Sequence, residues 1–176
     1  VIGEVTKLCK SYRSTYEIAE LAQKIQANDE LEPVLRHGEQ PEILKLNSAE
    51  LELSGIADLI NLFKKSTSKS LGIICKTEDQ AQMMAEKLKV YIDDVYFLSS
   101  QSTAFVQGIV VTSAHMAKGL EFDEVIVPQV NNMNYSSAID KSMLYVAVTR
   151  AMHKLTLTYC GIRSSFISLS FVWSFA

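Results

Sequence analysis

The chain has 176 residues, of which 48% are apolar and 21% charged, enough to bury the core of one domain but hardly of two. Its net charge of −3 excludes a strongly basic nucleic-acid-binding module, so any contact with a polyanion must be local. Its three cysteines, Cys9, Cys75 and Cys160, lie far apart without a C-x-x-C spacing, which excludes a disulfide framework and argues against zinc. We therefore expect a single domain in a reducing, cytoplasmic compartment.

Strand and helix patterns alternate along the chain. A strand is predicted over residues 5–12, followed by a helix that Ser14 and Glu17 open with the spacing of a capping box. The further predicted elements are, in order, a short apolar segment over 42–46, a helix over 48–63, a loop over 64–70, a strand over 71–75, a helix opened by the capping box of Thr77 and Gln80, strands over 95–99, 108–113 and 122–127, a helix over 140–151 and a strand over 154–160.

This alternation predicts an α/β domain whose mostly parallel sheet is covered by helices on both faces. In such sheets ligands gather at the carboxyl ends of the strands, so reactive residues are expected just after strands. Tyr12 and Arg13 meet this condition, and so do residues 112–115. The apolar run 164–176 is too short for a membrane span, no secretory signal is recognised, and we expect the chain to be a piece of a longer protein.

Two arginines are candidates for binding phosphate. Arg13 is either an arginine solvated at a strand end or, with Tyr12, part of a site where an aromatic ring stacks on a base and a guanidinium fork holds phosphate. Arg150 ends an almost wholly apolar helix. Its partner is either the carbonyl end of that helix or a phosphoryl group in transfer, in the manner of an arginine finger.

The segment from Lys118 to Glu121 allows two interpretations. Gly119 either forms a tight turn between solvated charges or brings the backbone close to a nucleotide, with Glu121 accepting a hydrogen bond from a ribose hydroxyl. Just upstream, neutral donors that could touch a nucleic-acid backbone are supplied by Thr112, Ser113 and His115.

No metal site is predicted. Asp123 and Glu124 resemble an acidic pair that holds Mg²⁺ in ATPases, but we expect them to precede their strand, where such a pair should follow one. We therefore reject them as a metal site. The sequence shows no catalytic triad and no His/Cys cluster.

Three segments in order resemble motifs IV, V and VI of UvrD/Rep-type superfamily 1 helicases. They are KSYRSTYEIAELAQKI (motif IV at about 8–20), VTSAHMAKGLEFDEVIVP (motif V at about 111–127) and MLYVAVTRAMHKLTLTY (motif VI at about 143–152). The resemblance implies a RecA-like, P-loop NTPase-type three-layer sandwich, the second motor domain (domain 2A) of an ATP-driven DNA helicase. The phosphate loop and the acidic pair for Mg²⁺ belong to a first domain that this chain does not contain.

The resemblance also assigns roles to residues. Tyr12 would stack near adenine, Arg13 and Arg150 would reach the γ-phosphate as arginine fingers, and Gly119 and Glu121 would approach the ribose and phosphates of ATP. The single-stranded or partly duplex DNA would lie against Thr112, Ser113 and His115. ATP and Mg²⁺ would be shared with the N-terminal motor domain of the same protein, so the chain alone is expected to be inactive.

The segment ahead of motif V is too short for the accessory domain of the larger family members, and this compactness resembles the helicase IV/HelD branch. That branch leaves an alternative open, a non-catalytic interaction module that acts on RNA polymerase. The acidic charge balance favours this alternative, whereas the presence of both arginines favours the motor. A third reading is a flavodoxin-like domain that binds a small phosphorylated ligand.

Overall fold

A computed structural model describes residues 14–27, 36–102 and 107–167 of the chain. It contains a six-stranded sheet with the order β1-β6-β5-β2-β4-β3, in which every neighbouring pair is parallel. The strands are β1 (Glu42–Leu46), β2 (Leu71–Cys75), β3 (Val95–Phe97), β4 (Ile109–Ser113), β5 (Phe122–Val127) and β6 (Ala151–Cys160). The strand predicted over residues 5–12, together with Tyr12 and Arg13, lies outside the described residues.

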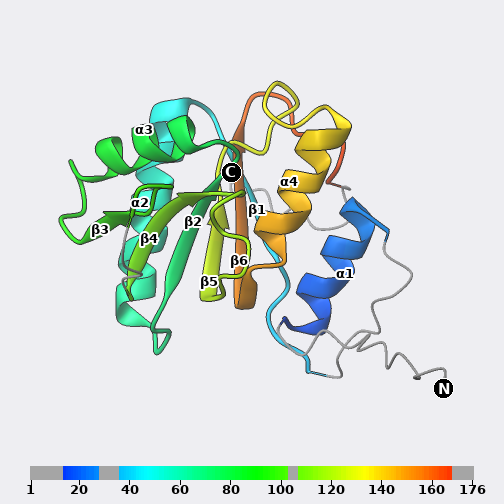
Figure 1. Ribbon diagram of the computed structural model, residues 1–176, viewed down its shortest axis with the longest axis horizontal. Helices are drawn as coiled ribbons and strands as arrows, with labels where there is room; N and C mark the ends of the chain where they lie inside the picture. The colour runs from blue at the N-terminus through cyan, green and yellow to red at the C-terminus, as the bar shows by residue number, and fades with distance from the viewer. Residues whose placement is uncertain (1–13, 28–35, 103–106, 168–176) are drawn as a thin grey trace, which may run out of the picture.

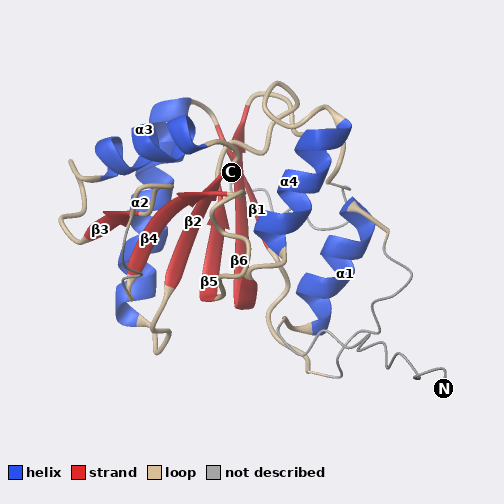
Figure 2. Cartoon of the chain, in the orientation of Figure 1, coloured by secondary structure: helices blue, strands red, loops and turns tan. Residues whose placement is uncertain are grey.

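Four helices cover the two faces of this sheet (Figure 1). They are α1 (Tyr16–Ile25), α2 (Ala49–Lys65), α3 (Glu78–Leu88) and α4 (Ala138–Val148). Helices α2 and α3 lie on one face, and α1 and α4 pack together on the other, as the colouring by secondary structure also shows (Figure 2). The predicted three-layer α/β fold is therefore confirmed.

The core consists of two apolar layers, one on each side of the sheet. Successive residues of β2 point to opposite layers: Ile74 packs with α1 and α4, whereas Ile73 and Cys75 pack with α2 and α3. A strand buried on both faces needs a continuous apolar run, which is why β2 reads LGIIC. Burial raises the pKa of the Cys75 thiol to about 12, so this cysteine is an unreactive core residue.

Two local predictions were wrong because tertiary contacts occupy the side chains in one case and the backbone in the other. Ser14 and Glu17 do not form a capping box: Thr15 is the N-cap residue of α1, while Ser14 and Glu17 bind other parts of the chain. The last predicted helix ends at Val148 rather than at residue 151, because Ala151 already pairs with Phe122 in the sheet. By contrast, the capping box of Thr77 and Gln80 is confirmed.

The acidic pair Asp123 and Glu124 lies within β5 and not ahead of it. Asp123 accepts hydrogen bonds from the backbone N–H groups of Lys69 (2.6 Å) and Ser70 (3.1 Å), so its carboxylate fastens the loop that leads into β2. Among the described residues, no helix is long and apolar enough to cross a membrane.

Candidate functional site

A turn over residues 114–121 connects the carboxyl end of β4 to the amino end of β5. Its first part is helical in character, with Ala117 N–H donating to the Ser113 carbonyl at 2.9 Å and Leu120 N–H to the Ala117 carbonyl at 3.0 Å. Gly119 then adopts a φ of +85°, a conformation that side chains with a Cβ rarely adopt. A Cβ built on Gly119 meets nothing within 4 Å, so the backbone is open to an approaching ligand here.

Arg150 lies beside this turn. Its guanidinium donates from Nε to the Val146 carbonyl at 3.2 Å and from Nη1 to the Leu120 carbonyl at 3.4 Å, and Nη2 donates to Thr149 Oγ1 at 3.2 Å. The bond to Val146 is the contact with the helix's own carbonyl end that the sequence offered as one alternative. The bond to Leu120 brings Arg150 to the residue between Gly119 and Glu121.

These residues lie at the amino ends of the strands. Glu121 immediately precedes β5 and Arg150 immediately precedes β6, and the N–H of Phe122 donates to the Arg150 carbonyl at 3.0 Å. Gly119, Glu121 and Arg150 therefore do not meet the expectation that reactive residues follow strands. We call this group, together with Ser14, the amino edge.

The predicted nucleic-acid contacts lie at the opposite end of β4. Thr112 is fully buried and its hydroxyl donates to the Leu98 carbonyl at 2.9 Å, while the buried Ser113 hydroxyl accepts from Met116 N–H at 3.3 Å. His115 is exposed. His115 can therefore contact a ligand directly, whereas the hydroxyl of Thr112 is already hydrogen-bonded to the loop after β3.

A groove runs between this turn and α4. Its lining comprises Ala114, His115, Lys118, Ile139, Ser142, Met143 and Val146. The α4 residues have the spacing of one helix face, and Val146 also accepts the hydrogen bond of Arg150. The groove thus reaches from His115 to the neighbourhood of Arg150.

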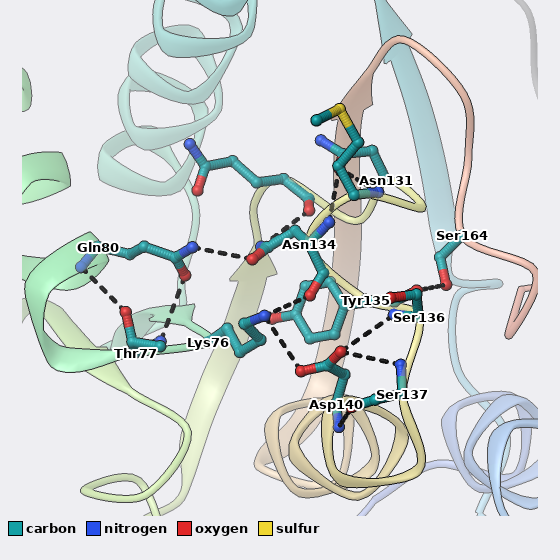
Figure 3. Close-up of polar contacts among 12 residues, drawn as sticks. Lys76, Thr77, Gln80, Asn131, Asn134, Tyr135, Ser136, Ser137, Asp140 and Ser164 are labelled. Atoms are coloured by element: carbon teal, nitrogen blue, oxygen red, sulfur yellow. Dashed lines mark hydrogen bonds and ion pairs between the residues drawn. The ribbon is translucent and has the colours of Figure 1, made fainter.

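A polar cluster that the sequence analysis missed occupies the carboxyl ends of β2 and β5 (Figure 3). Lys76 donates to the Asn134 carbonyl at 2.5 Å and pairs with Asp140 at 3.1 Å, and Gln80 donates to the Asn134 side chain at 2.8 Å. We call Lys76, Gln80, Asn134 and Asp140 the carboxyl-edge cluster. The helices after β2 and β5 leave toward opposite faces, so the cluster lies at the topological switch point of the sheet.

Asp140 is the central acceptor of this cluster. Burial acts to raise the pKa of its carboxyl, but hydrogen bonds from the N–H groups of Ser137 and Ser136, with the Lys76 ammonium, outweigh burial and hold the pKa well below its usual range. Ser137 and Asp140 form the capping box of α4. The Ser-x-x-Asp spacing is the signal that could have revealed this cluster from the sequence.

Glu52 was also missed. Its side chain is buried, and its Oε1 accepts from the Thr158 hydroxyl at 2.6 Å and from Gln129 N–H at 2.8 Å. Gln129 has a positive φ of 58°. The sequence signal for a buried Glu52 is its position on the apolar stripe of α2, four residues before Ile56. In the parts of the chain that the structure describes, no group of His, Cys, Asp and Glu could hold a metal ion.

Comparison with known structures shows which fold this is. The chain is similar to the C-terminal domain of a possible DNA helicase from Lactobacillus plantarum WCFS1, with a TM-score of 0.78 and 27% identity over 92% of this chain and 97% of that one. The fold is therefore that of a RecA-like helicase domain. Residues 108–158, which include the turn, α4 and Arg150, match the family model of the UvrD-like helicase C-terminal domain.

Two further comparisons add little. The UvsW helicase of bacteriophage T4 is weakly similar, with a TM-score of 0.49 and 14% identity over 66% of this chain and 46% of that one. No curated protein gives a significant match.

Proposed function

We propose that this chain is the second motor domain of an ATP-dependent DNA helicase, in which Arg13 and Arg150 act as arginine fingers toward ATP. The observation that carries the proposal is the hydrogen bond from Arg150 to the Leu120 carbonyl, which joins the turn of Gly119 and Glu121 to the end of α4. Both segments lie within residues 108–158, which match the UvrD-like helicase C-terminal domain.

The amino edge suits a nucleotide phosphate chain. The positive φ and open side of Gly119 let a ligand come close to the backbone, and the guanidinium of Arg150 offers a fork that fits phosphate oxygens. ATP would supply the phosphoryl group whose transfer drives the motor. Glu121 would accept from its ribose and Tyr12 would stack on its base, while Mg²⁺ would be held by the first motor domain.

The groove beside α4 extends this site toward nucleic acid. His115 and Lys118 line it and are both exposed, so they can meet the backbone of single-stranded or partly duplex DNA. Ser113 and Thr112, which lie beneath them, would support this contact from within. Movement of the amino edge on ATP hydrolysis would then shift His115 along the strand of DNA.

ATP hydrolysis by purified residues 1–176 tests the proposal directly. We expect no turnover by the chain alone, with or without single-stranded DNA, because the phosphate loop and the acidic pair are not in it. When the chain is joined to the first motor domain of its parent protein, DNA-stimulated turnover should appear. Robust hydrolysis by residues 1–176 alone would contradict the proposal.

One observation favours a second candidate function, an interaction module of a HelD-like protein that acts on RNA polymerase in the cytoplasm. Met133 (92% exposed) and Ile162 (71% exposed) present apolar side chains near the carboxyl-edge cluster, on segments joined by a hydrogen bond from Asn132 N–H to the Ile162 carbonyl at 2.9 Å. Under this non-catalytic alternative, a Met133→Ser/Ile162→Ser variant should lose binding to purified RNA polymerase and keep its fold, as measured by thermal unfolding. If the unaltered protein does not bind the polymerase, the alternative is wrong.

A further inference from the structure

A buried hydrogen bond joins the start of α1 to the start of β6. The hydroxyl of Ser14 donates to the Ala151 carbonyl at 2.7 Å across 137 positions of sequence, and Ser14 is only 6% exposed. Ser14 is covalently bonded to Arg13, and Ala151 to Arg150. The bond therefore links the two chain positions that directly follow the two predicted arginine fingers.

The bond is not explained by helix capping. Thr15, not Ser14, occupies the N-cap position of α1, so the Ser14 hydroxyl plays no part in satisfying the first turn of that helix. Its partner instead belongs to the first residue of a strand that follows α4. A role in holding two distant segments in register fits this geometry, whereas a local role does not.

A second connection runs in parallel with the first. The guanidinium of Arg36 donates to the Met152 carbonyl at 2.7 Å, and the Arg36 carbonyl accepts from Tyr16 N–H at 2.8 Å. The buried Glu17 carboxylate also accepts from Gly38 N–H at 2.9 Å. The first turn of α1 is thus tied to the first two residues of β6 by two routes, so loss of the Ser14 bond alone should not detach α1.

We propose that Ser14 is a positioning residue that fixes motif IV against motif VI, so that Arg13 and Arg150 approach the phosphates of ATP with a set spacing. This inference rests on the proposed motor function. Transfer reactions depend steeply on geometry, and a misplacement of about 1 Å can cost roughly 100-fold in rate. Loss of the Ser14 bond should therefore lower kcat for ATP hydrolysis and leave KM for ATP nearly unchanged.

The chain offers a matched control for this test. Ser164 is also a buried serine whose hydroxyl donates at 2.7 Å to a backbone carbonyl, that of Tyr135, but it lies away from the amino edge. In the protein that contains both motor domains, Ser14→Ala should lower kcat about 10- to 100-fold, whereas Ser164→Ala should change it less than about 2-fold. Both variants should lose similar thermal stability. Ser14→Thr, which retains the hydroxyl, should recover most of kcat.

A double-mutant cycle separates positioning from a structural role. In an Arg13→Ala background, Ser14→Ala should lower kcat little further, because one of the two groups whose spacing it sets is gone. If Ser14→Ala does not fold, Ser14→Cys, with its weak donor, takes its place with the same expectation. Equal kcat losses for Ser14→Ala and Ser164→Ala, or additive losses with Arg13→Ala, would overturn the inference. If Arg150→Ala leaves turnover intact, the proposed function itself fails.

Discussion

Two charged side chains at opposite ends of the sheet, Lys76 and Arg150, differ in the hydrogen bonds that they make. At the carboxyl edge, Lys76 is held by the carboxylate of Asp140 and by the Asn134 carbonyl, at 3.1 and 2.5 Å. At the amino edge, Arg150 donates to the carbonyls of Val146 and Leu120 at 3.2 and 3.4 Å, at or beyond the usual length of an N–H···O bond. The first arrangement matches charge with charge, whereas these contacts of Arg150 match charge with neutral dipoles.

The long bonds of Arg150 to the two carbonyls indicate which of its contacts a ligand could replace. A guanidinium can bind a phosphate through two short parallel bonds between opposite charges, so a phosphate can displace a single long bond to a carbonyl. Lys76 would lose an ion pair by turning to a ligand. The carboxyl-edge cluster therefore resembles a fixed junction between β2, β5 and α4, and under the proposed function the amino edge is the end that responds to ATP.

The largest effect is expected at Arg150. In the protein with both motor domains, Arg150→Ala should lower ATP turnover roughly 10³- to 10⁵-fold, the range observed for arginine fingers. Arg150→Lys should also abolish turnover while leaving the fold intact, because an ammonium lacks the planar fork. The measurements are steady-state ATP hydrolysis and thermal unfolding. If Arg150→Lys lowers only the melting temperature, Arg150 serves the end of α4, a contribution of about 0.3–1 kcal/mol.

Substitutions in the carboxyl-edge cluster should lower the free energy of unfolding. Lys76→Met leaves the Asp140 carboxylate without its cation, and because both side chains are less than a fifth exposed, we expect a loss of about 2–3 kcal/mol in the free energy of unfolding. Denaturant unfolding measures this loss. The double variant Lys76→Met/Asp140→Asn should lose less than the sum of the single variants. Additive losses would show that the pair is not coupled, and the contrast between the two edges would then disappear.

The sequence predicted the order of elements well because strands buried on both faces and amphipathic helices leave strong patterns. The apolar runs of β2 and β4 and the capping box at Thr77 were each identified correctly. Tertiary hydrogen bonds leave no such pattern. Ser14 and Glu17 have capping-box spacing, yet each side chain bonds to a residue outside α1. The predicted capping box therefore does not form.

The motifs single out Gly119, Glu121 and Arg150 as candidate site residues, and their role stays a prediction. The rule for open α/β sheets points to the other end of the strands, because these three residues lie at the amino ends. Lys76 and Asp140, which do lie at the carboxyl ends, were missed. Their partnership depends on the adjacency of β2 and β5, which are far apart in sequence, so it could not be inferred without the sheet order.

Two glycines provide a matched comparison of the edges. Gly119 and Gly161 have positive φ values of +85° and +80°, and a Cβ on either meets nothing within 4 Å. Substitution by alanine should therefore cost both variants a similar backbone strain of about 1–2 kcal/mol, measured by denaturant unfolding. Only Gly119→Ala should also raise KM for ATP, because its Cβ occupies the side from which ATP approaches. An equal effect on KM from Gly161→Ala would contradict the assignment of ATP to the amino edge.

The smallest effect concerns Glu17, which fastens the segment over 36–38 to α1. Burial acts to raise the pKa of its carboxyl, but hydrogen bonds from His37 and from Gly38 N–H outweigh burial and lower the pKa from its ordinary value of 4.5. Because the folded carboxyl binds its proton less readily than the unfolded one, its stabilisation is complete above about pH 4.5 and is lost as the pH falls through the lower folded pKa.

Glu17→Gln should therefore reduce the free energy of unfolding by about 1 kcal/mol at pH 7, and the difference from the unaltered chain should vanish in acid. The control is Glu39→Gln, whose side chain is 70% exposed and lies 3.8 Å from Lys154. Its effect should stay within about 0.5 kcal/mol at every pH, as for most surface pairs. If the Glu17→Gln difference persists below the folded pKa, the side chain acts through its shape rather than its charge. Helix α1 would then be held to β6 by the bonds of Ser14 and Arg36, without a contribution from the charge of Glu17.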